Sequence, residues 1–275
     1  MPIKIKDTDF YSLHGIWGAN ASLALGRIGR GAGMVVGNVQ PPLRALYVGY
    51  RAGAVRPILM PFVPDVKVGL GVDAFVADAQ NGNGDSPDAR KRFVSYFGKE
   101  DIIREISMSG ETWRAGSLAM TVTSFFGEIP DPDTQDHASL RRGMRPAIYV
   151  RLSFDNSGND EPMTGIFGMQ GIHRPLSDST KGAVLGFVHP QDWGFATNRA
   201  EGVDEVMEWS SLIAFDGKPH PIRRLASEGC LRFTVPAGER KEYVVAIGSL
   251  RESFLTSGVR TRLFQSTLFS DVDSV

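Results

Sequence analysis

The 275-residue chain has little cysteine and no long apolar run, and each lack excludes a class of protein. The one cysteine, Cys230, cannot form an internal disulfide, so nothing marks the chain for an oxidising compartment. We expect Cys230 to be a small buried side chain in a strand. No stretch has the length of a signal peptide's apolar region or of a membrane span. These lacks predict a soluble, cytoplasmic protein.

An excess of charge of one sign is also missing, because 30 Lys and Arg stand against 31 Asp and Glu, for a formal net charge of -1. A chain with this balance has no overall field that would hold a nucleic-acid backbone or an anionic membrane. We therefore exclude nucleic acid and membranes as partners. Any ligand is expected to be uncharged or recognised locally.

The usual signatures of cofactor and nucleophile sites do not occur. The histidines lack the spacing of a helical metal pair, so no metal site is expected. The glycine-rich run at residues 26–33 has neither the lysine of a phosphate-binding loop nor the flanking elements of a dinucleotide site, which favours a turn or bulge. No Gly-x-Ser-x-Gly elbow is present either. We expect no cofactor. The histidines are His14, His137, His173, His189 and His220.

Glycine and proline are plentiful, at 31 and 16 residues, and favour a turn-rich β protein over a helical bundle. A hydrophobic share of 42% is enough to bury a core, which excludes disorder as the default state. At residues 148–154 apolar and polar side chains alternate, the period of a strand with one buried face. Turn-forming residues follow at 155–159, and a second strand at 163–169 completes a predicted hairpin.

The same order of strand, turn and strand recurs over residues 231–247 and predicts a second hairpin. Helix is favoured at 133–142 and in the C-terminal segment, where residues 255, 259, 263 and 272 fall on one helical face. The fold class is therefore all-β, a large antiparallel β-sandwich at residues 1–250 with a short C-terminal helical or connecting segment at 251–275. Further strands are expected at residues 43–50, 102–108, 118–126, 183–188 and 211–215.

Two sets of residues are candidates for carbohydrate chemistry. Four carboxylates gather between residues 128 and 136, and two carboxylates at the right separation cleave glycosidic bonds, although an exposed acidic loop is the favoured interpretation. Tryptophan faces stack on sugar rings. Most tryptophans of a sandwich belong to its core, but Trp17, in the glycine-flanked stretch after His14, is the one we expect at a ligand. The full sets are Glu128, Asp131, Asp133 and Asp136, and Trp17, Trp113, Trp193 and Trp209.

Several short runs occur in order along nearly the whole chain. They are Phe10 with His14-x-x-x-Gly18-Ala19-x-Ala21-Ser22-x-x-Leu25-Gly26, Pro41-Pro42 with Tyr47-x-Gly49, Arg104-Glu105, Thr112-Trp113-x-Ala115-Gly116-x-Leu118, Pro130-Asp131-Pro132-x-Thr134, Pro146-Ala147 with Asp155-Asn156, and Val235-Pro236-Ala237-Gly238-Glu239 with Lys241 and Tyr243. Together they resemble the N-terminal domain of glycoside hydrolase family 52, the bacterial β-xylosidases, whose clan also includes family 116.

In that family a large β-sandwich packs on a C-terminal (α/α)6 barrel, and the barrel supplies both carboxylates of a retaining mechanism. The resemblance implies that this chain is a non-catalytic sandwich domain or subunit of a β-xylosidase-like hydrolase of xylan degradation, which supports the barrel and walls its active site. We expect the chain to end where the barrel would begin, and to contain no catalytic carboxylate. His14 and Trp17 are the substrate-rim candidates. Leu13 replaces a second histidine of the family, and Trp17 an aliphatic residue, which bears on the preference for xylose.

The partners that the resemblance implies are a helical (α/α)6 catalytic domain, in the same chain or a separate one, a carbohydrate, and a second copy of the chain. One alternative is a stand-alone carbohydrate-binding or structural β-sandwich that binds sugar through Trp17. Another is a small hydrolase that uses the carboxylates at residues 128–136. An apolar docking face is expected beside the C-terminal segment. It would be formed by some of Leu255, Val259, Leu263, Phe264, Leu268 and Phe269.

Overall fold

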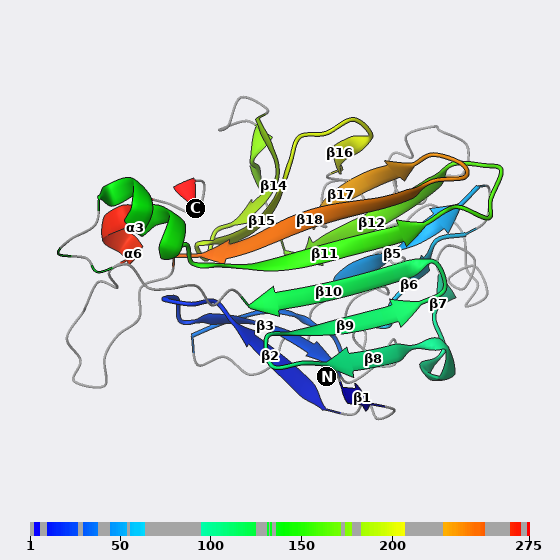
Figure 1. Cartoon of the computed structure of the whole chain (residues 1–275), viewed down its shortest axis with the longest axis horizontal. Helices are drawn as coiled ribbons and strands as arrows, with labels where there is room; N and C mark the ends of the chain where they lie inside the picture. The colour runs from blue at the N-terminus through cyan, green and yellow to red at the C-terminus, as the bar shows by residue number, and fades with distance from the viewer. Residues whose placement is uncertain are drawn as a thin grey trace, which may run out of the picture.

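Three sheets make up the described part of the protein, and the two larger ones enclose a shared core (Figure 1). The computed structural model describes residues 3–5, 10–26, 30–37, 45–53, 56–63, 95–124, 131, 133, 136–171, 174–177, 183–206, 228–250, 265–270 and 274–275. Within these residues the largest sheet has nine strands, in spatial order β1 (Ile3–Ile5), β8 (Ile103–Ile106), β9 (Gly110–Ala115), β10 (Leu118–Ser124), β11 (Ala147–Asp155), β18 (Arg240–Ser249), β15 (Trp193–Asn198), β14 (Val184–His189) and β13 (Arg174–Pro175).

The other two sheets are smaller. The second has six described strands, in the order β16 (Val203–Val206), β17 (Glu228–Val235), β12 (Met163–Gln170), β5 (Leu46–Ala52), β6 (Ile58–Leu59) and β7 (Ser95–Tyr96). The third has three, β2 (Tyr11–Gly15), β3 (Ala21–Gly26) and β4 (Gly33–Val36). The described strand pairs are antiparallel except β6 with β7, which is parallel. The predicted fold class, an all-β antiparallel sandwich, is confirmed.

The core lies between the two larger sheets, and β11 shows how the sequence builds it. Ile148, Val150, Leu152 and Phe154 alternate along this strand and are at most 1% exposed. They pack with side chains of β5, β12 and β17 from the facing sheet. Each buried aliphatic or aromatic side chain of this size contributes about 1.5–3 kcal/mol through removal of its surface from water. The strand predicted at residues 148–154 is therefore confirmed, with its buried face.

Most of the other predicted elements are present. The strands expected at 43–50, 102–108, 118–126 and 183–188 overlap β5, β8, β10 and β14, whereas 211–215 lies outside the described residues. Cys230 is 1% exposed in β17, as predicted. In the glycine-rich run, Gly26 ends β3 with a φ of 117°, and a Cβ there would overlap the Phe10 carbonyl. This backbone geometry fits a turn, although residues 27–29 lie outside the described residues.

Both predicted hairpins are wrong, because the strands on either side of each turn lie in different sheets. β11 pairs with β10 and β18, whereas β12 pairs with β5 and β17. In the same way β17 belongs to the second sheet and β18 to the first. The turns at residues 156–162 and 236–239 therefore carry the chain across the core. Turn residues specify that the chain reverses, and the alternation of a strand is the same whichever strand pairs with it.

Asn156 ties these two crossing turns together. Its side chain is fully buried, and Nδ2 donates to the carbonyl oxygens of Glu161 (3.0 Å), Val235 (3.2 Å) and Pro236 (2.8 Å). Oδ1 accepts a hydrogen bond from Nδ2 of Asn159 at 2.7 Å. Because backbone carbonyls buried at a turn lose their water, the asparagine amide replaces the hydrogen bonds that water would supply.

Two short helices pack against each other at one end of the sandwich (Figure 1). Helix α3 (His137–Gly143) begins after its N-cap Asp136, later than the predicted start at residue 133, and α6 spans Gln265–Leu268. A 3-10 turn, η2, spans Lys99–Asp101. In the rest of the predicted C-terminal segment, residues 269–270 and 274–275 are described and are not α-helical, whereas 251–264 and 271–273 lie outside the described residues. The last described strand ends at Ser249, and the division of the chain at residue 250 stays a prediction.

The predicted docking face does not include Leu268 and Phe269. These side chains are 7% and 3% exposed and pack on Leu140 and Met144 of α3, so this apolar surface is covered within the chain. The physical reason is that α3 offers its own apolar face at the same end of the sandwich. Leu255, Val259, Leu263 and Phe264 lie outside the described residues.

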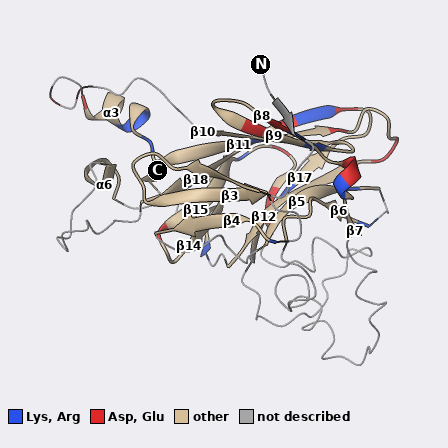
Figure 2. Cartoon of the chain, turned by 90° about the horizontal axis from the view of Figure 1, so that it is seen from below, with Lys and Arg blue, Asp and Glu red and all other residues tan. Residues whose placement is uncertain are grey.

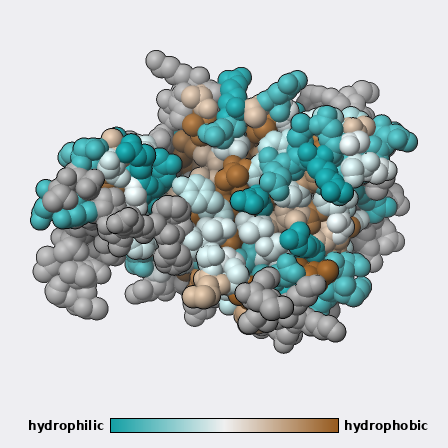
Figure 3. Space-filling view, viewed as in Figure 1, coloured by the Kyte–Doolittle hydropathy of each residue, from teal (hydrophilic) through white to brown (hydrophobic). Residues whose placement is uncertain are grey.

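The described surface is mixed in hydropathy. In the view of Figure 3, hydrophobic areas alternate with hydrophilic ones along the visible face of the largest sheet. Val244 on β18 and Ile103 on β8 are about half exposed, at 49% and 48%. Of the helices in the described residues, none has the length and apolar character needed to cross a bilayer.

Replacing Asn156 with aspartate tests the tie between the crossing turns. Aspartate keeps the shape but puts a carboxylate against three buried carbonyl oxygens, so we expect the free energy of unfolding to fall by about 3 kcal/mol. Urea denaturation at neutral pH measures the change. Asn198→Asp, at an exposed end of β15, is the control and should change stability by less than about 0.5 kcal/mol. Equal effects of both variants would contradict the assigned role of Asn156.

Candidate functional site

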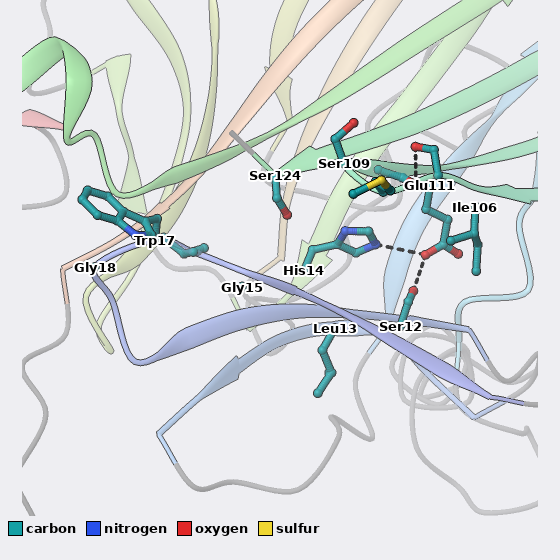
Figure 4. Close-up of a pocket in the computed structure, with 14 residues that line it drawn as sticks. Ser12, Leu13, His14, Gly15, Trp17, Gly18, Ile106, Ser109, Glu111 and Ser124 are labelled. Atoms are coloured by element: carbon teal, nitrogen blue, oxygen red, sulfur yellow. Dashed lines mark hydrogen bonds and ion pairs between the residues drawn. The ribbon is translucent and has the colours of Figure 1, made fainter. Parts of the chain in front are cut away.

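His14 and Trp17, the two predicted rim residues, line one pocket. Its volume is about 510 Å³, a size that admits a small ligand. Three segments form its wall: residues 12–18 at the end of β2, residues 106–111 around the turn between β8 and β9, and Ser124 at the end of β10. The third sheet thus packs here on β9 and β10 of the largest sheet, and Figure 4 shows the side chains that meet.

The alternation of β2 decides which of its side chains face the pocket wall. Ser12 and His14 are two residues apart, so they lie on the same face of the strand and both reach Glu111 of β9. Leu13 lies on the opposite face and is 62% exposed. The face of β2 that carries Ser12 and His14 is therefore polar and is directed toward the largest sheet.

Glu111 is the centre of the polar contacts at the pocket. It is 2% exposed, on the inward face of β9 that also carries Trp113. Oε2 lies within hydrogen-bond distance of Nε2 of His14, at 3.0 Å, and accepts a hydrogen bond from the Ser12 hydroxyl. Oε1 accepts from Nε of Arg104 at 2.6 Å. Figure 4 shows the first two contacts on one side of the carboxylate.

Arg104 is fully buried and lies between two aromatic rings. Its guanidinium carbon is 4.2 Å from the centre of the Phe10 ring and 4.6 Å from that of Trp113. Nη1 donates to the Phe10 carbonyl at 3.1 Å, and Nη2 has no hydrogen-bond partner in the described part of the chain. The negative faces of the two rings stabilise the charge where hydrogen bonds do not. Figure 2 shows charged residues of both signs on β8 and β9.

These contacts keep Glu111 ionised. Burial acts to raise the pKa of its carboxyl, but the hydrogen bonds from His14 and Ser12, followed by the Arg104 charge, outweigh burial and lower the pKa below its ordinary value. The carboxylate is therefore an acceptor on both oxygens. Because both carboxylate oxygens of Glu111 already have hydrogen-bond partners within the protein, Glu111 forms part of the pocket wall. The neighbouring side chains are the ones that can contact a ligand.

Trp17 joins the pocket to the helical end of the protein. It is partly buried and packs on the cluster formed by α3 and α6. The next residue, Gly18, has a φ of 71°, and a Cβ there would overlap the amide of Gln265, so glycine is required. Trp113 and Trp193 are in the core, as expected, at 0% and 2% exposure, and Trp209 lies outside the described residues.

The acidic candidates lie apart from this pocket. Asp131 and Asp133 are exposed, and Asp136 caps α3, where its Oδ1 accepts from the backbone N–H of Ser139 at 2.8 Å. That backbone hydrogen bond lowers the pKa of Asp136. The exposed-loop interpretation therefore holds for these three, and Glu128 lies outside the described residues. No group of three or more potential ligands within the described residues is placed to hold a metal ion.

The interpretation from sequence missed Glu111 and gave Arg104 no role. A signal for both existed, because Glu111 and Trp113 alternate on one face of β9, although no strand was predicted there. A carboxylate on an inward face requires a buried cation. The partner strand β2 is nearly a hundred residues earlier in the chain, and no local pattern predicts that it lies there.

The described strands define an antiparallel β-sandwich, and comparison with known proteins shows the family to which it belongs. Residues 23–275 match the family model of Glycosyl hydrolase family 52, and the chain belongs to this family. It is 25% identical to a beta-xylosidase of Geobacillus stearothermophilus over 286 residues, which cover 97% of this chain and 38% of that protein. A second beta-xylosidase of the same organism is 25% identical over 258 residues, 86% of this chain and 40% of that protein. The chain thus spans about two fifths of the length of these relatives.

Replacing Glu111 with glutamine tests the ionised carboxylate. The variant leaves Arg104 buried without a counter-charge, so we expect a loss of about 3 kcal/mol in the free energy of unfolding at pH 7. Because the folded-state pKa of Glu111 is lowered, its contribution is complete above the ordinary glutamate pKa and is lost as the pH falls through the lower, folded value. The difference in the free energy of unfolding between wild type and variant, measured by urea denaturation, should therefore become smaller below about pH 4.3.

The matched control for this experiment is Glu105→Gln, on the neighbouring strand β8. The Glu105 carboxylate lies 3.6 Å from a half-exposed Arg114, a pair of the kind that contributes about 0–1 kcal/mol. If the difference in the free energy of unfolding between wild type and Glu111→Gln stays constant between pH 7 and pH 3, folding does not lower the pKa of the Glu111 carboxyl.

Proposed function

We propose that this chain is the non-catalytic N-terminal sandwich of a retaining β-xylosidase-like glycoside hydrolase, which supports an (α/α)6 barrel and walls its active site. The family match over residues 23–275 carries the proposal. Beta-xylosidases align with nearly the whole chain, although the chain spans only 38% and 40% of their length. The remaining length of such a relative is enough for a catalytic domain.

The chemistry of the pocket supports the non-catalytic part of this proposal. Retaining hydrolysis needs two carboxyl groups about 5 Å apart, one of them able to give and take a proton. Among the residues that line the described pocket, Glu111 is the single carboxylate. Three donors already engage it and its pKa is lowered, which makes it a poor general acid.

We assign His14 and Trp17 to the rim of the substrate site. The Trp17 indole offers a flat apolar face of the kind that packs on sugar rings, and its contacts with the α3–α6 cluster limit its movement. His14 and the serines of the pocket offer polar groups for sugar hydroxyls. The placement of both residues on one pocket supports this assignment, with xylose-based oligosaccharides as the substrate class. The role in xylan degradation, the cytoplasmic location and pairing with a second copy stay predictions.

A reconstitution experiment tests whether the barrel catalyses the reaction and the sandwich supports it. We expect the purified chain to leave nitrophenyl β-xyloside intact, and expect hydrolysis once a family 52 polypeptide that carries the barrel without its own sandwich is added. The barrel polypeptide by itself, and the chain by itself, are the controls. Hydrolysis by the chain that Asp131→Asn abolishes would overturn the proposal in favour of a small hydrolase.

A second candidate function, a stand-alone carbohydrate-binding sandwich, is favoured by one observation: both rim residues and the whole described pocket belong to this chain. Calorimetry of xylobiose binding to the purified chain tests this function, and variants of Trp17 test the contribution of the rim. Because stacking contributes about 0.5–1.5 kcal/mol, Trp17→Ala should weaken binding by about two- to tenfold. Trp17→Phe keeps an aromatic face and is the matched control. Equal affinity of wild type and Trp17→Ala would remove Trp17 from the rim.

A further inference from the structure

We propose that Glu111 is a positioning residue, which fixes the imidazole of His14 with its proton on Nε2, so that Nδ1 accepts a hydrogen bond from a hydroxyl of an uncharged sugar. This inference rests on the proposed function, because it says how the rim residue His14 recognises its ligand. It adds a residue, Glu111, and a direction of hydrogen bonding that the proposed function leaves open.

The first step is the contact between the two side chains. Nε2 of His14 lies 3.0 Å from Oε2 of Glu111, and the imidazole is 8% exposed. An ionised carboxylate has no proton to give, so the nitrogen facing it must be the donor. A lone pair on Nε2 would instead face a negative oxygen. The tautomer with the proton on Nε2 follows from this contact.

The second step is the ionised state of the carboxylate, which rests on geometry. Oε1 of Glu111 accepts from Nε of the fully buried Arg104 at 2.6 Å, and the Ser12 hydroxyl donates to Oε2. A guanidinium does not lose its proton in proteins, so the counter-charge must lie on Glu111. With a neutral His14 the three side chains sum to zero charge, which is the balance that a buried cluster requires.

The third step concerns the opposite nitrogen. In a neutral imidazole with a proton on Nε2, Nδ1 is an acceptor. Within the described part of the chain Nδ1 of His14 has no hydrogen-bond partner. Figure 4 shows the ring between Glu111 on one side and Ser124 with Trp17 on the other. The acceptor therefore belongs to the pocket, where a ligand can reach it.

The ligand class follows from these groups. A lone pair on Nδ1 attracts an O–H donor and repels an anion, whereas the hydroxyls of Ser109 and Ser124 act as donor or acceptor. The apolar face of Trp17 adds a surface for a ring. Hydroxyl groups on an uncharged ring match this set. We therefore expect neutral sugars to bind in preference to sugars that carry a carboxylate.

The decisive measurement is the tautomer of His14 in the wild-type chain, by NMR of protein labelled with ¹⁵N-histidine. His14→Ala identifies the signals of His14. We expect Nε2 to carry the proton in wild type and in the control Glu105→Gln, and expect a mixture of both tautomers in Glu111→Gln. A proton on Nδ1 in wild type would overturn the proposal. Because wild type decides it, the test stands even where loss of Glu111 prevents folding.

The ligand side is tested with xylobiose and with glucuronic acid in calorimetry. His14→Ala and Glu111→Gln should each weaken xylobiose binding by about three- to tenfold, the size of one hydrogen bond, and the double variant should be no weaker than His14→Ala. Glucuronic acid should bind wild type more weakly than xylose does. Additive losses, or a preference for the acid, would overturn the role of Glu111. Absence of xylobiose binding in wild type would contradict the proposed rim, whereas the tautomer would still test Glu111.

Discussion

A buried carboxylate is stable only with donors around it, and this constraint on Glu111 organises the end of the sandwich where the pocket lies. Arg104 from β8 supplies the charge, and His14 and Ser12 from β2 supply hydrogen bonds. Removing any one of them leaves part of a buried charge unsatisfied. The third sheet is therefore fixed against β9 of the largest sheet by polar contacts as well as by apolar packing. The hydrogen bonds of this cluster hold the wall of the pocket in place.

The same cluster explains how a pocket with a glutamate and a histidine fits a supporting role. General acid–base catalysis needs a group that exchanges its proton near the working pH. Glu111 has its pKa lowered and its oxygens engaged, so it serves to hold other groups in place.

The sequence predicted the elements better than their partners. The alternation at residues 148–154 identifies β11 and its buried face, because that pattern depends on neighbours in the chain. The two hairpins were wrong because sheet partnership depends on contacts that no window of residues contains. Trp17 was chosen as a loop residue between glycines and His14 through the family resemblance, and both line one pocket. Glu111 was missed for the same reason as the sheet partners, since its donors on β2 lie far away in the chain.

The crossing turns divide each large sheet between two parts of the chain. Strands up to β11 form one side of both sheets and strands from β12 onward form the other, joined where β11 meets β18 and where β12 meets β5. During synthesis on the ribosome, β11 and β5 in the first part have unpaired edges until β18 and β12 in the second part have been made. Open edges of this kind invite pairing with other chains. Correct assembly of both sheets therefore depends on β18 and β12 reaching those edges before another chain does.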